Sequence, residues 1–432
     1  MSPEYEFRSF PAGLADSPDA PKADEPTAAW LQATALGFLE DERTEPLLGR
    51  IAEVYVEDSR RLSGAYTPRT LPGVWPAELP VATYATFDKK LNVGGGRQIT
   101  ARLVAGVTVR ANHRRRGLMR QLVEGDLKAA AADGIPICAL HAAEATIYGR
   151  FGFGPATSHR RVHVDTGPGF ALDHEPTGTV DVAGRAALFV HAPEVFARFH
   201  AQTLGSIERS ASYPSKIAGI WAEDRPEPLL STRGLFHYDP SGELDGYVSY
   251  RFDGWGPKPP TISIIDFVTL NREAYLELWQ HLAAIDTVAR VHLDDAPLTD
   301  PLPWAMRDSR GYAITGGEDG IWLRILDVAA TLTARSYVFN GEISVLVKDA
   351  LGIATGQYLL TVRDGAAEVT RRNSGTADIT LDVSALGSLY LGGVSARTLA
   401  RAGTVTATST EALKTFDRLL RQDDEPVCIT GF

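Results

Sequence analysis

Apolar and polar positions follow one another in blocks that predict alternating strands and helices. Residues 80–87 and 99–109 are apolar runs of strand length, and the polar segment 88–97 between them holds three consecutive glycines. We interpret this segment as the turn of a hairpin. It is not interpreted as a phosphate loop, because no helical pattern follows it.

The next block predicts a strand, a basic turn and a helix in succession. After Gly117, apolar residues fall on one stripe at i, i+4 spacing, which predicts an amphipathic helix ending near residues 133–134. An apolar strand is expected over 135–140. The segment 144–154 then predicts a short helix that its glycines end.

The N-terminal region predicts a strand over residues 4–10, a mobile loop and two helical pieces. The loop is expected because prolines interrupt the segment before Trp30, at positions 11, 18, 21 and 26. Helical spacing then runs from Trp30 to about Arg61, and Pro46 breaks it because proline lacks an N–H and its ring obstructs the preceding turn.

A second unit starts near Arg161 and repeats part of the first. Residues 247–252 and 261–270 read as strands, and 272–285 reads as a helix. Only Asn271 joins the last strand to the helix, without an arginine cluster or a glycine, so this copy lacks the parts that hold pyrophosphate. We interpret it as a degenerate, non-catalytic duplicate.

A third unit is expected to open with the strand 320–326 and a helix over 328–334. Four strands are predicted over 343–347, 358–362, 366–370 and 377–381, and three helices over 383–390, 396–402 and 410–420. This pattern predicts an α+β domain without a catalytic motif.

Composition narrows the class of protein. The chain has 432 residues, 44% of them hydrophobic and 22% charged, and a formal net charge of −11, so it is a folded, acidic protein and not a nucleic-acid binder. Cys138 and Cys428 form no disulfide or metal pattern, and His113 and His141 show no metal-ligand spacing. The first residues resemble no signal peptide and no long apolar run occurs, which predicts a cytoplasmic enzyme without a membrane span.

The basic turn Arg114–Arg116 with Gly117 carries the clearest chemistry. A helix N-terminus offers free amides and the positive end of its dipole, the glycine admits a close approach, and arginines match phosphate charge. The alternative is a solvated basic turn or a nucleic-acid patch. Its place between a strand and a helix favours pyrophosphate, and therefore a nucleotide-tailed cofactor.

Four segments carry a family resemblance. Arg114–Met119 is similar to the Arg/Gln-x-x-Gly-x-Gly/Ala motif of the Gcn5-related N-acetyltransferase (GNAT) superfamily, with Met119 in place of the final small residue. The strings 113–118, 147–157 and 386–392 and the terminal Phe432 resemble the Eis (enhanced intracellular survival) acetyltransferases over essentially the full length.

The resemblance implies a mixed α/β, α+β architecture of three domains. Residues 1–160 would form a catalytic GNAT domain, 161–312 a degenerate GNAT-like domain, and 313–432 a sterol-carrier-protein-like domain whose C-terminus reaches the active site. It also implies direct acetyl transfer, in a ternary complex, from acetyl-CoA to amines such as aminoglycosides, without a metal, by a homohexamer.

The resemblance further implies the residues of the site. Tyr148 would be the general acid and the C-terminal carboxylate of Phe432 the base. The expected cofactor contacts are Val107, Thr108, Val109, Arg114, Arg115, Gly117, Leu118 and Glu144.

Elementary chemistry fits these roles. An amine is protonated at neutral pH and needs a proton acceptor before it attacks a thioester, and a terminal carboxylate accepts protons. The amide of Val107 or of a neighbouring residue, freed by a strand irregularity, would stabilise charge on the thioester oxygen. Taken without the family, Tyr148 would read as a packing aromatic and Phe432 as a frayed end.

The acceptor side is predicted from charge and aromatic residues. Glu40–Glu42 with Glu45 would attract a polycation, or would simply be a solvated helix end, and Trp30 and Phe38 would shape the entrance. Gly431 stands where some family members carry an acidic residue. The alternatives are a protein-lysine or polyamine acetyltransferase and a non-catalytic lipid-binding or scaffold protein.

Overall fold

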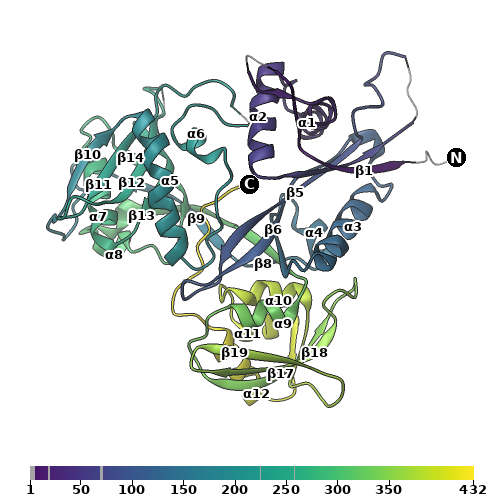
Figure 1. Cartoon of the computed structure of the whole chain (residues 1–432). Coiled ribbons are helices and arrows are strands. Elements are labelled where there is room, and N and C mark those ends of the chain that lie inside the picture. Colours follow the sequence, from purple (N-terminus) through teal and green to yellow (C-terminus); the bar gives the residue numbers. More distant parts are fainter. Residues whose placement is uncertain (1–4, 18–19, 69–71, 224, 257) are drawn as a thin grey trace.

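Three lobes surround the C-terminus of the chain in this computed structural model, which describes residues 5–17, 20–68, 72–223, 225–256 and 258–432 (Figure 1). The first two lobes are built on seven-stranded sheets and the third on a five-stranded sheet. Glu4 and Pro18, which belong to the predicted N-terminal strand and loop, lie outside the described residues.

The first sheet carries the basic turn. Its strands, in spatial order, are β1 (Glu6–Pro11), β4 (Arg61–Tyr66), β5 (Ala82–Asn92), β6 (Gln98–Val109), β7 (Ile137–His141), β16 (Ile321–Ile325) and β8 (Gly154–Pro155). The associated helices are α1 (Glu25–Phe38), α2 (Glu45–Glu57), α3 (Leu118–Ala132) and α4 (Ala145–Tyr148).

The second sheet repeats this plan. Its strands, in order, are β10 (Thr179–Ala183), β11 (Arg233–Tyr238), β12 (Leu244–Phe252), β13 (Thr261–Thr269), β14 (Arg290–Ala296), β9 (Ser158–Asp165) and β15 (Tyr312–Asp319). Its helices are α5 (Arg185–Gln202), α6 (Tyr213–Ile217), α7 (Arg272–Ala283) and α8 (Leu302–Ala305).

The third lobe lies against the first sheet. Its strands, in order, are β19 (Ala366–Arg372), β18 (Gly356–Arg363), β17 (Gly341–Lys348), β20 (Ile379–Asp382) and β21 (Val405–Ala407). Its helices are α9 (Val328–Ala334), α10 (Val383–Tyr390), α11 (Ala396–Arg401) and α12 (Thr410–Leu420). One hydrophobic core runs without interruption from the first sheet into this lobe.

The two large sheets exchange strands. β9, which follows the first unit in sequence, pairs with β14 and β15 in the second sheet. β16, which follows the second unit, pairs with β7 and β8 in the first sheet. The strand 320–326 was expected to open the third unit, and this placement is wrong: the segment completes the first sheet, because its apolar side chains are buried there on both faces.

Two close contacts fix the third lobe on β16. A Cβ at Gly387 in α10 would lie 2.4 Å from the carbonyl oxygen of Leu323, so only glycine permits this approach. The buried Arg324 guanidinium pairs with Asp349 at 2.7 Å and donates to the carbonyl oxygen of Phe151. An ion pair buried this deeply is retained because each charge satisfies the other.

The N-terminal region differs from the prediction of one mobile loop. Lys22–Ala23 forms β3, paired with β2 (Leu14–Ala15), and α1 begins at Glu25, where Asp24 accepts a hydrogen bond from the Thr27 amide. Pro46 begins α2 instead of ending a helix, since its missing N–H costs nothing at that position. Arg61 is the first residue of β4 and does not end a helix.

Candidate active site

The predicted pyrophosphate turn lies between β6 and α3. Gly117 precedes the helix with φ 78°, and Arg115 also has a positive φ of 62°. No side chain caps this helix end and no acidic residue stands in its first turn. The first amide of α3 to find a backbone acceptor in the helix is that of Gln121, so the preceding amides are available to an anion.

The arginines of the turn are free of acidic partners. No carboxylate of the described residues forms an ion pair with Arg114, Arg115 or Arg116. Arg114 donates to the Val109 carbonyl oxygen at 3.2 Å, and Arg116 donates to the Tyr5 hydroxyl at 2.9 Å. The strained φ of Arg115 is the kind of local cost that is kept where a loop has a ligand to hold.

A β-bulge interrupts β6 beside this turn. Thr83 of β5 pairs with Thr108 and Ala85 pairs with Ala105, so that Gly106 and Val107 together face Tyr84. Gly106 has φ 58°, and a Cβ there would lie 2.8 Å from Trp30. The irregularity expected at Val107 is therefore present, and it follows from a glycine packed under a tryptophan.

The expected cofactor residues differ in what they present. The Thr108 side chain is buried, bonds to the Thr83 hydroxyl at 2.7 Å and packs against Gly37 of α1. Leu118 is a core residue. Only the main chain of these two residues is open to a ligand. Val107 and Val109 are partly buried against the cluster that contains Tyr148, and Glu144 is exposed at the start of α4.

β6 and β7 separate above this bulge. They pair in parallel only from Ala101–Leu103 to Ile137–Ala139, although β6 continues to Val109 and β7 to His141. Tyr148 lies on α4, just beyond the end of β7, and is 7% exposed. Burial raises its pKa to about 12, so that the phenol keeps its proton at pH 7. Among the described residues its hydroxyl has no hydrogen-bond partner.

The C-terminal segment reaches the same end of the sheet. The ring centroid of Phe432 lies 4.8 Å from that of His141 and 6.2 Å from that of Phe87 in β5. The Gly431 amide donates to the Tyr213 hydroxyl of α6 at 2.5 Å. The terminus is thus held between the first two lobes, as Figure 1 shows, and is not a frayed tail.

The Arg60 guanidinium packs against Phe87, which in turn contacts Phe432. The guanidinium of Arg60 lies 4.0 Å from the ring centre of Tyr55 and 4.2 Å from that of Phe87. Arg60 also pairs with the buried Asp58. Sequence reasoning did not identify Arg60, Phe87 or Tyr213, since nothing local marks them. Gly106 had a signal, a glycine inside an apolar strand.

The predicted acceptor side is only partly present. Trp30 was expected to shape the entrance, and this is wrong: it is fully buried and its indole donates to the Ser63 carbonyl oxygen. An apolar face of α1 pulls it into the core. Phe38 is half-exposed at the end of α1. Glu40–Glu42 lie in the exposed connection to α2, where Glu40 pairs with Arg43.

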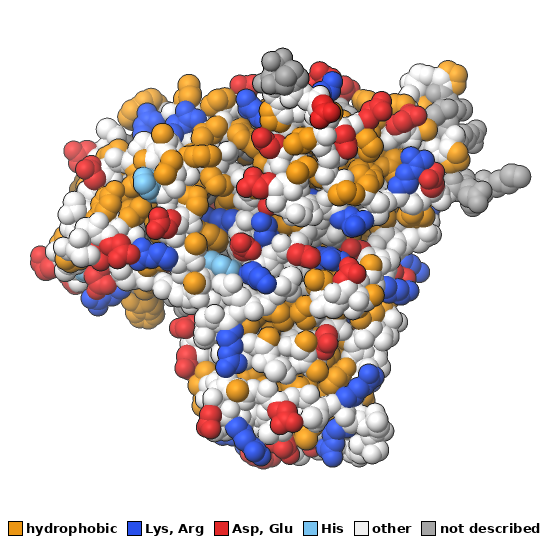
Figure 2. Space-filling model, in the orientation of Figure 1, with side chains coloured by type: hydrophobic (Ala, Val, Ile, Leu, Met, Phe, Trp, Pro, Cys, Tyr) orange, Lys and Arg blue, Asp and Glu red, His pale blue; other side chains and the backbone are white. Residues whose placement is uncertain are grey.

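The turn fits the diphosphate of a coenzyme A nucleotide. Its donor set consists of free helix amides and arginines, which is the chemistry that phosphate oxygens need. Within the described parts of the chain, no three His, Cys, Asp or Glu side chains gather as a metal site would require. None of the described helices is both long and apolar enough to cross a bilayer. Acidic and basic side chains intermingle on the face in Figure 2, without a continuous basic stripe.

Comparison with known domains defines the class. Acetyltransferase (GNAT) domain sequences match residues 22–156 and again residues 205–325, and the sterol carrier protein domain matches residues 328–429. With the uncapped helix and the bulged strand, these matches define an acetyltransferase with tandem GNAT domains and a C-terminal sterol-carrier-protein-like domain. GNAT acetyltransferases use acetyl-CoA.

Individual relatives define the family. The N-acetyltransferase Eis of Mycobacterium tuberculosis is 32% identical over 81% of this chain and 85% of its own. An uncharacterized N-acetyltransferase of Streptomyces griseus is 33% identical over 93% of this chain and 96% of its own. The crystal structure of Eis1 from Mycobacterium abscessus matches with a TM-score of 0.80 and 28% identity, over 99% of this chain and 100% of that one. The chain belongs to the Eis family of N-acetyltransferases, enzymes that transfer acetyl groups to amines.

Proposed function

We propose that this enzyme acetylates amino groups of small polycationic amines such as aminoglycosides, by direct transfer from acetyl-CoA in a ternary complex. The observation that carries the proposal is the meeting of Phe432 with His141 at the end of β7, next to α4 and Tyr148. This contact brings the last residue of the chain to the end of the sheet where β6 and β7 part, and α4 with Tyr148 follows β7 there.

The basic turn binds the cofactor in this proposal. The amides that follow Gly117 and the side chains of Arg114 and Arg115 contact the pyrophosphate. Val107, Thr108 and Val109 contact the rest of the cofactor along β6, Leu118 contributes its amide, and Glu144 closes the far side. Bound acetyl-CoA supplies an acetyl thioester.

The catalytic groups divide the proton transfers. The Phe432 carboxylate accepts a proton from the ammonium of the substrate, which frees the nitrogen for attack. With a usual pKa near 3.5, the carboxylate needs partial desolvation to act near pH 7. The packing of the Phe432 ring against Phe87 and His141 keeps this residue out of bulk water and supports such desolvation. The Val107 amide donates to the thioester oxygen, and Tyr148 donates to the departing thiolate.

Direct transfer is favoured over a cysteine acyl-enzyme. Both cysteines are buried, and burial raises the pKa of Cys428 to about 11 and that of Cys138 further still. A thiolate is the nucleophile in acyl transfer to cysteine, so neither residue is activated for it.

The acidic charge of the protein supports a polycationic amine as the acetyl acceptor. The net charge of −11 and the exposed Glu40–Glu42 attract a polycation. Gly431 supplies no carboxylate beside Phe432, so a polyamine or a protein lysine is the second candidate acceptor. The cytoplasmic location and the hexamer remain predictions, and light scattering measures the latter.

Thiol release from acetyl-CoA tests the proposal with kanamycin, spermidine and a lysine peptide as acceptors. Faster release with kanamycin than with either rival supports it, and release only with the peptide contradicts the acceptor class. Thermal stabilisation by fatty acids or sterols but not by acetyl-CoA would point instead to the lipid-carrier alternative.

A further inference from the structure

A cavity of about 900 Å³ lies in the second lobe, where β13 and β14 separate. These strands pair only from Thr261–Ser263 to Arg290–His292, although β13 continues to Thr269 and β14 to Ala296. The cavity therefore occupies the same place in the second sheet as the opening between β6 and β7 in the first. Its volume is that of a small-molecule site.

This cavity does not have the means to hold a phosphate. At the start of α7 the Asn271 side chain already accepts the Ala274 amide at 2.8 Å, and Glu273 places a negative charge in the first turn. Arg272, the one arginine at this helix end, pairs with Glu273 at 2.8 Å. The duplicate has kept the hollow and lost the anion site.

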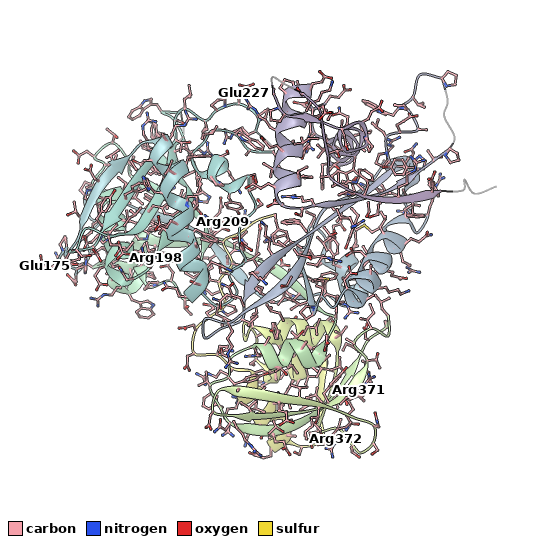
Figure 3. All side chains as sticks on the ribbon, viewed as in Figure 1. Glu175, Arg198, Arg209, Glu227, Arg371 and Arg372 are labelled. Atoms are coloured by element: carbon pink, nitrogen blue, oxygen red, sulfur yellow. The ribbon has the colours of Figure 1, made fainter. Side chains whose placement is uncertain are left out.

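The charge of the cavity wall has the opposite sign from that of the basic turn. Four aspartates and two basic residues line it: Asp173, Asp266, Asp294, Asp295, Lys216 and Arg272. Three of these aspartates are taken by partners, because Asp173 pairs with Arg307, Asp266 with Arg209, and Asp294 with His292. Arg209 lies at the centre of the molecule beside the first lobe (Figure 3).

Asp295 is the carboxylate that keeps capacity for a ligand. Its nearest ionisable partner is His159 at 3.9 Å, and its side chain is 49% exposed. Burial raises the pKa of Asp295, and the charges of His159 and Lys216, which also lines the cavity, oppose this rise. Asp295 forms no hydrogen bond with another described side chain, so its carboxylate can accept one from an ammonium group.

Aromatic residues line the wall of the same cavity. Phe267 and Tyr275 stack with ring centroids 5.4 Å apart, and Asp300 accepts a hydrogen bond from the Tyr275 hydroxyl, which fixes the ring. Trp304 lines the same cavity and is 91% exposed. Exposed tryptophan and fixed aromatic faces attract apolar bodies and organic cations.

We propose that this cavity is a second ligand site, which binds an amphipathic primary amine with its ammonium at Asp295 and its apolar body against Phe267, Tyr275 and Trp304. This inference goes beyond acetyl transfer. Because Asp295 also lines a smaller pocket with His141 and Gly431, Trp304→Ala is the variant that distinguishes this cavity from the candidate active site. Val427 and Ile429 form part of the same wall, so the bound amine lies behind the segment that ends at Phe432.

Isothermal titration of the full chain with 4-phenylbutylamine tests the site, with 4-phenylbutanoate as the probe of opposite charge. We expect the amine to bind, the acid to bind at least tenfold more weakly, and Asp295→Asn to weaken amine binding about tenfold, the effect of one charge-assisted hydrogen bond. Asp286→Asn, an exposed aspartate outside the cavity, is the matched control and should change nothing.

Trp304→Ala separates this cavity from the catalytic lobe, because the exposed Trp304 supports no core. It should weaken the amine several-fold without lowering the melting temperature. Equal affinity for amine and acid, or unchanged amine affinity in Trp304→Ala, would overturn the site. Since titration needs no turnover, an inactive enzyme that still binds the amine leaves this inference standing.

Discussion

The Nε2 atom of His141 lies 3.0 Å from the carbonyl oxygen of Thr430, across a separation of 289 residues. A carbonyl only accepts, so Nε2 carries the hydrogen. Burial lowers the pKa of His141 and keeps its ring neutral near pH 7. The last residues of the chain are therefore fixed at the end of β7 by a group of the first lobe.

Moving the terminal carboxylate should impair turnover. One glycine added after Phe432 moves the terminal carboxylate one residue away from the ring that packs on His141, and we expect kcat to fall at least tenfold. Phe432→Leu is the control, since it keeps the carboxylate in place and loses only ring contacts. Steady-state rates with saturating acetyl-CoA measure both, and equal rates for the extended and native chains would exclude Phe432 as the base.

Removing the Tyr148 hydroxyl should lower kcat by about 10- to 1000-fold while KM for acetyl-CoA changes little. Because the pKa of Tyr148 is raised to about 12, the native enzyme should not lose its acid between pH 7 and 10. Tyr148→Phe is compared with Tyr358→Phe in β18, far from the opening. A native rate in Tyr148→Phe would leave the residue with a packing role.

The two glycines that flank α3 form a matched pair for testing the basic turn. Gly117 before the helix and Gly134 after it have φ of 78° and 76°, and neither has an atom near a built Cβ. Alanine should cost about 1–2 kcal/mol of stability at either site. Only Gly117→Ala should also raise KM for acetyl-CoA, about tenfold; an equal rise in Gly134→Ala would argue against a phosphate site at the turn.

Asp126 on α3 gives a pH dependence of known sign. Burial raises its pKa from 3.8 to about 6, despite the hydrogen bond from Tyr84 and the nearby Arg102. A group whose pKa is raised on folding stabilises most below its unfolded pKa, and this contribution is lost as pH rises through 6.

Asp126→Asn should therefore stabilise the protein above pH 7, by at most about 3 kcal/mol, and give no gain at pH 4. Urea unfolding at the two pH values measures this difference. A variant that is less stable than the native chain at pH 8 would show that the carboxylate is ionised and well paired.

Local patterns were sufficient for several of the elements and for placing the basic turn between a strand and a helix. The apolar stripe after Gly117 predicted α3, and the blocks 383–390 and 410–420 coincide with α10 and α12, because each element's burial is written in its own spacing. The bare joint at Asn271 was correctly distinguished from the basic turn, and the capped α7 explains the difference.

Long-range placement was beyond such patterns. An apolar strand such as Ile321–Ile325 satisfies any sheet, and only the assembled molecule selects β7 as its neighbour. The sequence around Trp30 is compatible with a place at the site entrance or in the core. In the structure Trp30 packs over Gly106, which has no side chain, and is therefore buried in the core. The path of the last residues past Tyr213 likewise depends on contacts between lobes. Only the family resemblance predicted that Phe432 would lie near the first sheet.

Because β9 and β16 are exchanged between the two large sheets, the first sheet can be completed only after most of the second unit has been synthesised. During synthesis the first sheet lacks an internal strand until residue 325 has left the ribosome, and Phe432 arrives about a hundred residues later still. A fragment cut at residue 160 would expose the edge of β7 and invite pairing with other chains. Each large lobe therefore covers a strand edge that the other would otherwise leave exposed.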